Sequence, residues 1–134
     1  MWFEDVWNAE NVSALADIAT PDVVMVDPCC WRDPYHGRTR VSKVIEEYLG
    51  AFKGFQHEVT EIMPSKDGSV VMVRWQATAV HLGTFVGSPA SGRVERIEGM
   101  STFRFEGGRI ARVEVFRESL SQERRGLGVA DYGM

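Results

Sequence analysis

The segment from Val80 to Arg93, VHLGTFVGSPASGR, places a histidine at the end of an apolar-alternating stretch and directly before a glycine-rich connection. An imidazole can take up or release a proton near neutral pH, so His81 is a candidate catalytic group. The ordinary alternative is that His81 caps a hairpin or satisfies a hydrogen bond in the core. The closely spaced glycines indicate a sharply bent ribbon that joins two strands.

A second set of polar groups lies in residues 109–118. Residues two apart along a strand share a face, so the segment sorts into two sets. One face carries Ile110, Arg112, Glu114, Phe116 and Glu118, and the other carries Ala111, Val113, Val115 and Arg117. The second set is the more apolar. Periodicity alone therefore predicts that the side chains of Arg112, Glu114 and Glu118 face solvent.

The other groups that could bind a metal or act as nucleophiles form no defined pattern. Cys29 and Cys30 are adjacent, and neighbouring cysteines rarely pair, so free thiols are predicted. The nearby donors are Asp27, Asp33 and His36. They fall short of a ligand set, so no metal site is predicted. His36 and His57 have no paired acid or nucleophile at a useful spacing, and both are predicted to be surface or loop residues.

These groups must be positioned by helices that precede a set of hairpins. Apolar spacing predicts one or two helices in residues 3–18, ended by Thr20-Pro21, and a clear helix from Val41 to Phe52. A short strand is expected at 23–26, and residues 28–39 have the composition of a loop, with Trp31 as a rim or lid residue. Four further strands are predicted at 55–63, 70–81, 94–106 and 109–118. Helices first and hairpins afterwards indicate an α+β fold.

Length and charge limit the class of protein. The 134 residues fit one domain, 1–134. The polar tail from about residue 119 is expected to be loosely held, with docking through Leu120, Leu127 and Tyr132 as the alternative. The net charge of −4 comes with no basic stripe, so nucleic acid is not an expected partner. No leader and no apolar stretch of about 18 to 20 residues is present in the sequence, so we expect no membrane association and a cytoplasmic protein.

Several short motifs, each weak alone, occur in an order that resembles one family. They are Trp7-Asn8, Asp22-Val23-Val24, Asp27-Pro28, Gly37, Phe52, Arg74-Trp75, the block from His81 to Arg93, Gly108-Arg109-Ile110 and Leu127-Gly128. The chain from Trp2 to Gly128 is similar to the SnoaL-like polyketide cyclase family. The resemblance implies a nuclear-transport-factor-two-like fold, in which a cone-shaped, curved, mixed or antiparallel sheet packs on N-terminal helices.

The resemblance also implies a site. The family pattern after Gly-Lys/Arg-Ile places a glutamate, a tryptophan and an acid/base aspartate where this chain has Arg112, Glu114 and Glu118. Glu118 keeps a carboxylate but adds a methylene group, and Val26 replaces a familiar histidine. The expected catalytic residues are Glu118 as base and His81 as donor. The expected substrate-binding residues are Trp31, Trp75, Phe85, Phe103, Arg112, Glu114 and Phe116.

The implied reaction is an intramolecular aldol-type cyclisation, or a related isomerase or lyase reaction, of a hydrophobic carbonyl compound. A carboxyl group in an apolar cavity has a raised pKa and can both take and return a proton, so the reaction needs no cofactor and no metal. The fold also supports ketosteroid isomerisation, dehydration and epoxide hydration. A non-catalytic ligand-binding or assembly module is the remaining alternative, and the departures at 26, 112, 114 and 118 favour it. A homodimer is expected in each case.

Overall fold

The computed structural model describes residues 1–29 and 33–127. Its centre is a six-stranded mixed sheet in the order β2-β1-β6-β5-β4-β3. The strands are β1 (Ala19–Val26), β2 (Tyr35–His36), β3 (Phe52–Pro64), β4 (Val70–His81), β5 (Val94–Glu106) and β6 (Arg109–Arg117). Strand β1 runs parallel to β6, and the other neighbours are antiparallel. The expected α+β fold with a curved sheet is confirmed.

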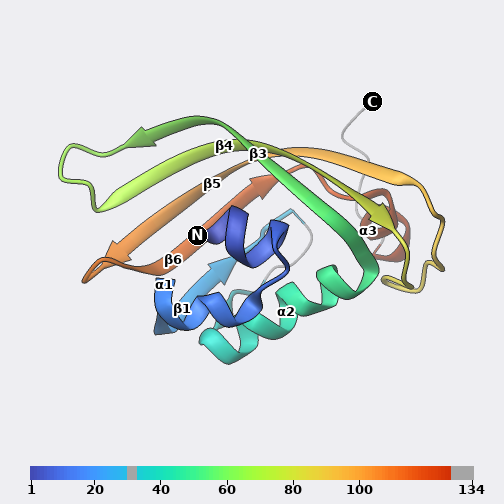
Figure 1. Ribbon diagram of the computed structural model, residues 1–134, viewed down its shortest axis with the longest axis horizontal. Coiled ribbons are helices and arrows are strands. Elements are labelled where there is room, and N and C mark those ends of the chain that lie inside the picture. The colour runs from blue at the N-terminus through green and yellow to red at the C-terminus, as the bar shows by residue number, and fades with distance from the viewer. Residues whose placement is uncertain (30–32, 128–134) are drawn as a thin grey trace.

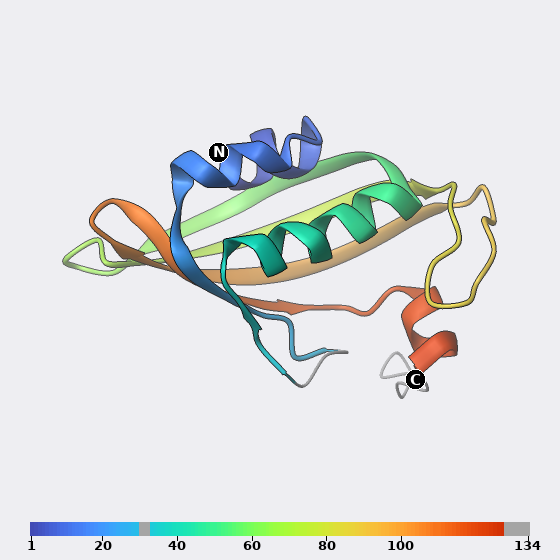
Figure 2. The same cartoon turned by 90° about the horizontal axis from the view of Figure 1, so that it is seen from below.

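The helices cover the concave face of this sheet. They are the π-helix η1 (Trp2–Asn8), the 3-10 helix η2 (Val12–Ala14), α1 (Leu15–Ile18), α2 (Arg38–Ala51) and α3 (Ser121–Leu127). Figure 2 shows the N-terminal helices and α2 on the same side of the sheet, with α3 at the end where the β4–β5 connection lies. The long strands β3, β4 and β5 arch over the helices in Figure 1.

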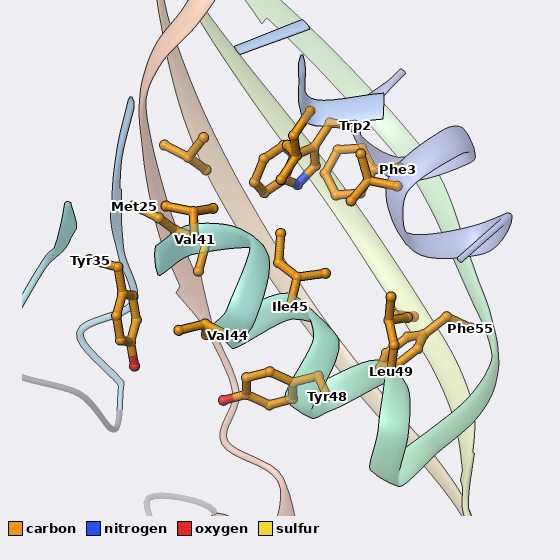
Figure 3. Packing of buried hydrophobic residues seen from close by; sticks show 14 of the residues in the cluster. Trp2, Phe3, Met25, Tyr35, Val41, Val44, Ile45, Tyr48, Leu49 and Phe55 are labelled. Atoms are coloured by element: carbon orange, nitrogen blue, oxygen red, sulfur yellow. The ribbon is translucent and has the colours of Figure 1, made fainter. Parts of the chain in front are cut away.

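Helix α2 packs on the sheet through one apolar stripe. Val41, Val44, Ile45, Tyr48 and Leu49 are buried and follow the three- and four-residue spacing of a helix face. These side chains point inward from α2 toward the sheet and η1 in Figure 3. Burying an aliphatic side chain of this size contributes about 1.5 to 3 kcal/mol. The stripe therefore fixes α2 in place and aims Tyr48 along the concave face.

The strand boundaries follow the turn signals of the sequence. The predictions for 70–81 and 94–106 match β4 and β5, and the glycine-rich segment between them is the expected bent connection. The N-terminal helical region ends at Ile18, and β1 begins at Ala19, earlier than the predicted strand at 23–26. Pro21 is accommodated there because the β1–β6 register breaks between Ala19 and Val24.

Strand β6 contains an irregularity that the simple alternation did not predict. The pairing with β5 shifts register between Arg104 and Phe105, so Arg112 and Ile110 take consecutive partners. A bulge of this kind turns the residues before it to the other face. Ile110 is consequently buried along with Val113, although the two were assigned to opposite faces.

Candidate functional site

A cavity that is open in part to solvent lies between the concave face of the sheet and the helices. Its walls are mostly apolar, and several rings contribute to them. The aromatic lining residues are Trp2, Phe3, Trp7, Tyr48, Phe52, Phe55, His57 and Trp75. The charged lining residues are Asp27, Glu95 and Arg117. A mostly apolar space lined by a few polar groups is typical of a small-molecule site.

Trp75 is the expected binding residue that the structure places in the cavity wall. Its Nε1–H donates to the Ser101 hydroxyl oxygen over 3.0 Å. Trp75 pairs across the sheet with Gly99, and a Cβ on that glycine would lie 2.5 Å from the indole and 2.9 Å from the Arg117 Cβ. Only glycine leaves room there, because real Cβ atoms do not approach so closely. Gly99 thus allows Trp75 and Arg117 to share one layer of the wall.

The acidic face predicted from the family pattern lies outside this cavity. Glu118 is exposed, and its Oε1 accepts the backbone N–H of Glu98 over 2.8 Å. Arg112 and Glu114 form an ion pair of 3.1 Å with each other, and Phe116 is 52 % exposed. The reason is strand parity, because the alternating residues Val113, Val115 and Arg117 face the concave side. Whether Glu118 takes part in a reaction stays a prediction, but its side chain does not line the cavity.

Two of the other expected residues are core residues outside the cavity lining. Phe103 packs edge-on against Trp2, with ring centroids 5.7 Å apart, and Phe85 packs against Tyr48 at 4.9 Å. Both are buried. Trp31 lies outside the described residues, so its expected role at the rim stays a prediction.

His81 is fully buried, and its contacts are those of the structural alternative; a part in catalysis stays a prediction. Its ring stacks on Phe52, and its Nδ1 accepts the Ser91 backbone N–H at 3.3 Å and the Gln122 amide at 3.1 Å. The Gln122 amide also donates to Glu95 Oε1, which fixes the amide orientation and makes Nδ1 an acceptor. His81 therefore ties the glycine-rich connection to α3, and it is not among the residues that line the cavity.

A buried set of charges, called here the ionic network, consists of Asp27, Tyr48, Arg117 and Glu123. Arg117 donates to both Asp27 oxygens, at 3.2 and 2.8 Å, and to both Glu123 oxygens, at 2.9 and 2.8 Å. It also donates to the Glu118 carbonyl and the Tyr48 hydroxyl, each at 3.1 Å. These contacts use all five N–H groups of the guanidinium. Arg117 has no N–H group left for a ligand.

The pKa values of Arg117 and Glu123 in the ionic network shift in the directions that keep both groups charged. Burial lowers the pKa of Arg117, but the Asp27 charge and the Glu123 hydrogen bond outweigh it, so the pKa lies well above its ordinary value. Burial raises the pKa of Glu123, and the Arg117 contacts reverse this, leaving the pKa below its ordinary value. Burial raises the pKa of Tyr48 well above its ordinary value. At neutral pH the ionic network therefore holds a charged Arg117 and Glu123 and a neutral Tyr48.

His57 lies in the cavity wall, not at the surface as predicted. Its ring is surrounded by the rings of Phe3, Trp7, Phe55 and Trp75, at centroid distances of 5.2, 5.5, 5.6 and 5.2 Å respectively. Burial lowers the pKa of His57 to about 4. The imidazole is therefore neutral at physiological pH. We call His57, its four neighbouring rings and Asn8 the His57 site.

Asn8 holds His57 through three polar contacts. The Asn8 Oδ1 accepts the His57 backbone N–H at 2.7 Å and lies 3.3 Å from the ring Nδ1, while Nδ2 donates to the His57 carbonyl at 3.2 Å. A signal for this placement was present in the sequence, since His57 alternates in phase with the apolar residues Phe55 and Val59. Glu123 had no such signal, because it lies in a polar run.

Other kinds of site are not indicated by the described part of the chain. Residues 1–29 and 33–127 contain no group of three or more His, Cys, Asp or Glu side chains that could hold a metal ion. No helix within those ranges is long and apolar enough to cross a membrane.

The chain matches the family model of the SnoaL-like domain over residues 1–113. A proposed SnoaL-like polyketide cyclase from Jannaschia sp. CCS1 has 18 % identity and a TM-score of 0.77, covering 87 % of this chain and 79 % of its own. IdmH, a proposed polyketide cyclase from Streptomyces antibioticus, has 22 % identity and a TM-score of 0.74, covering 95 % and 94 %. No curated protein matches in sequence. The match over most of its length shows that the chain belongs to the SnoaL-like domain family.

Proposed function

We propose that this protein binds a hydrophobic carbonyl compound in the cavity and catalyses a cofactor-independent proton transfer, as in an intramolecular aldol cyclisation or a related isomerisation. One observation carries the proposal. The Asp27 carboxylate, 5 % exposed, lies in the wall of a largely apolar cavity and is held there by Arg117. The structural likeness to proposed polyketide cyclases supports it.

In the proposed reaction, an Asp27 oxygen removes a proton from the carbon beside a substrate carbonyl. The C–H electron pair becomes the enolate, which attacks a second carbonyl carbon of the same molecule, and the new alkoxide takes the proton back from Asp27. The two hydrogen bonds from Arg117 hold the Asp27 carboxylate in a fixed orientation in the mostly apolar wall. Ser101, whose oxygen accepts the Trp75 N–H, has its own O–H to donate to the enolate oxygen.

The opening of 5-nitrobenzisoxazole tests the proposal, because this reaction begins with removal of a proton from carbon and gives a coloured phenolate. We expect the wild-type protein to accelerate it and Asp27→Asn to lose at least about tenfold of the rate, at the lower end of what a positioned base contributes. Glu118→Gln is the comparison variant and is expected to keep the rate. Thermal unfolding of each variant shows that a lost rate is not lost folding.

The opposite pattern, in which Glu118→Gln loses the rate and Asp27→Asn keeps it, would assign the base to Glu118. It would contradict the proposal that Asp27 in the cavity wall is the base. A wild-type protein with no acceleration would overturn the catalytic proposal. The second candidate function, a non-catalytic binding protein of the same fold, would then stand. The saturated Arg117 favours that candidate, because a closed network of charges also fits a purely structural role.

A further inference from the structure

The hydrogen-bond geometry of Asn8 determines which nitrogen of His57 carries the proton. The Asn8 Oδ1 must be the amide oxygen, since it accepts a backbone N–H at 2.7 Å, and Nδ2 correspondingly donates to a backbone carbonyl. Only a protonated Nδ1 can make a favourable contact with that oxygen at 3.3 Å. The neutral imidazole is therefore the Nδ1–H tautomer, and Nε2 carries a lone pair.

The Nε2 atom of His57 makes no hydrogen bond within the described part of the chain. Residues 1–29 and 33–127 supply no hydrogen-bond partner for it, and it is not among their buried unpartnered atoms. His57 lines the cavity, so the lone pair is accessible to a bound molecule. Leaving such an acceptor without a partner when a ligand displaces water costs about 1 to 3 kcal/mol. A ligand that donates a hydrogen bond at this place avoids the cost.

The charges around the cavity oppose an anionic ligand. Asp27 and Glu95 are in the lining, and Arg117, the cation of the described lining, is already shared between Asp27 and Glu123. The many rings of the wall offer flat apolar contact instead, which suits a planar conjugated molecule. A ligand carbonyl would face the lone pair of Nε2 and be repelled. A neutral planar hydroxyl compound satisfies all of these conditions.

We propose that His57 is a specificity-determining residue that accepts a hydrogen bond from the hydroxyl group of a neutral planar phenol or enol through Nε2, with Asn8 as its positioning residue. This inference rests on the cavity being the ligand site of the proposed function, and it adds the substrate class. It does not depend on Asp27 being a base. Such a ligand lies flat against the aromatic wall with its hydroxyl group directed at His57.

A pair of matched probes tests the inference, namely 2-naphthol and 2-methoxynaphthalene, which differ in the hydrogen-bond donor. Their dissociation constants are measured by calorimetry for the wild-type protein and for His57→Phe, which keeps an aromatic ring and removes the acceptor. We expect the preference for 2-naphthol over 2-methoxynaphthalene to fall about threefold to tenfold in His57→Phe, the worth of one net hydrogen bond. Comparing the two ratios cancels the different hydrophobicity of the probes.

The matched control is His36→Phe, the same substitution at an exposed histidine outside the cavity. We expect it to leave the preference at its wild-type value. A preference that is equal in His57→Phe and wild-type protein would overturn the role of His57 but not the proposed function. Absence of binding by both probes would overturn the cavity as ligand site as well. Loss of base catalysis in Asp27→Asn has no bearing on either ratio.

A second measurement tests the tautomer without any ligand. The ¹⁵N resonance of an unprotonated imidazole nitrogen lies far downfield of a protonated one, so the two nitrogens of His57 can be told apart by NMR. We expect a downfield Nε2 in the wild-type protein and a mixture of tautomers in Asn8→Leu, which keeps a similar side-chain size. A protonated Nε2 in the wild-type protein would overturn the inference.

Discussion

The ionic network and the His57 site lie against the same cavity, but they use their polar atoms differently. In the ionic network, every N–H group of Arg117 has a protein partner, and Glu123 is completely buried. In the His57 site, Asn8 occupies one ring nitrogen and leaves the other available. Hydrogen bonds in which every polar atom has a protein partner hold segments of the chain together. A polar atom without a partner among the described residues, such as His57 Nε2, can bind a ligand.

The two regions also differ in what their charges require. The ionic network joins β1, α2, β6 and α3 through charged groups that are stable when buried only because each is paired. The His57 site joins η1 and β3 through neutral groups, and burial keeps the imidazole uncharged. We therefore expect substitutions in the ionic network to change stability most, and substitutions in the His57 site to change pH dependence and binding.

The largest effect is expected for Arg117→Met, which removes the cation that Asp27 and Glu123 share. Two carboxylates would then face each other in a buried place, and we expect the free energy of unfolding to fall by about 3 to 5 kcal/mol. Urea unfolding followed by tryptophan fluorescence measures this change.

Arg112→Met is the matched control, because Arg112 pairs with Glu114 on the outer side of the same strand. That pair is partly exposed, so we expect a loss below about 1 kcal/mol. Equal losses in the two variants would contradict the distinction between a closed buried network and an ordinary surface pair.

A smaller effect is expected from the pH dependence of His57. The folded-state pKa of His57 is lowered to about 4 from its ordinary value of 6.5, so between these two values the unfolded chain takes up a proton and the folded protein does not. The contribution of His57 to stability therefore falls as the pH is lowered from 6.5 to about 4, and it is constant below that range. The loss is at most about 3 kcal/mol at 1.36 kcal/mol per pKa unit.

The variant His57→Phe isolates the pH-dependent contribution of His57 to stability, because it removes the titrating group and keeps an aromatic ring among the four neighbouring rings. Its free energy of unfolding, measured between pH 7 and pH 4, is expected to fall less than that of the wild-type protein. Parallel curves for the two proteins would show that His57 is accessible enough to be protonated in the folded state.

The smallest effect is expected for Glu118→Gln. The side chain is exposed, and a glutamine oxygen can still accept the Glu98 backbone N–H that Glu118 accepts now. We expect a change in unfolding free energy within about 0.5 kcal/mol and unchanged affinity for 2-naphthol. A large loss of affinity would place Glu118 in contact with the ligand and break the distinction between the cavity wall and the outer side of β6.

Much of the fold was predictable because its signals are local. Strands β4 and β5 end at residues 81 and 106 as predicted, since alternation stops there and glycine-containing turns follow. The apolar residues of α2 recur every three or four positions, a spacing typical of a helix. The family resemblance was also visible in the order of short motifs, and the match over residues 1–113 confirms it.

The candidate site was predictable only in part. Trp75 was expected in the cavity and lies there, whereas Glu118 was assigned inward from the family pattern although its strand parity pointed outward. His57 was dismissed for lack of a partner close in sequence, and its partner Asn8 is 49 positions away. Glu123 was part of a tail expected to be loosely held, and it is fully buried against Tyr48, 75 positions away.

The sequence by itself determined helix α2, the long strands, most strand faces and the family, because periodicity and turn chemistry act within one element. Only the tertiary structure decided which polar groups meet. Arg117 was already assigned to the apolar face of its strand, but nothing local required that Asp27, 90 positions away in the sequence, pair with it. Leaving a buried charge unpaired costs free energy, so the folded structure that pairs Arg117 with both carboxylates is favoured over structures that do not.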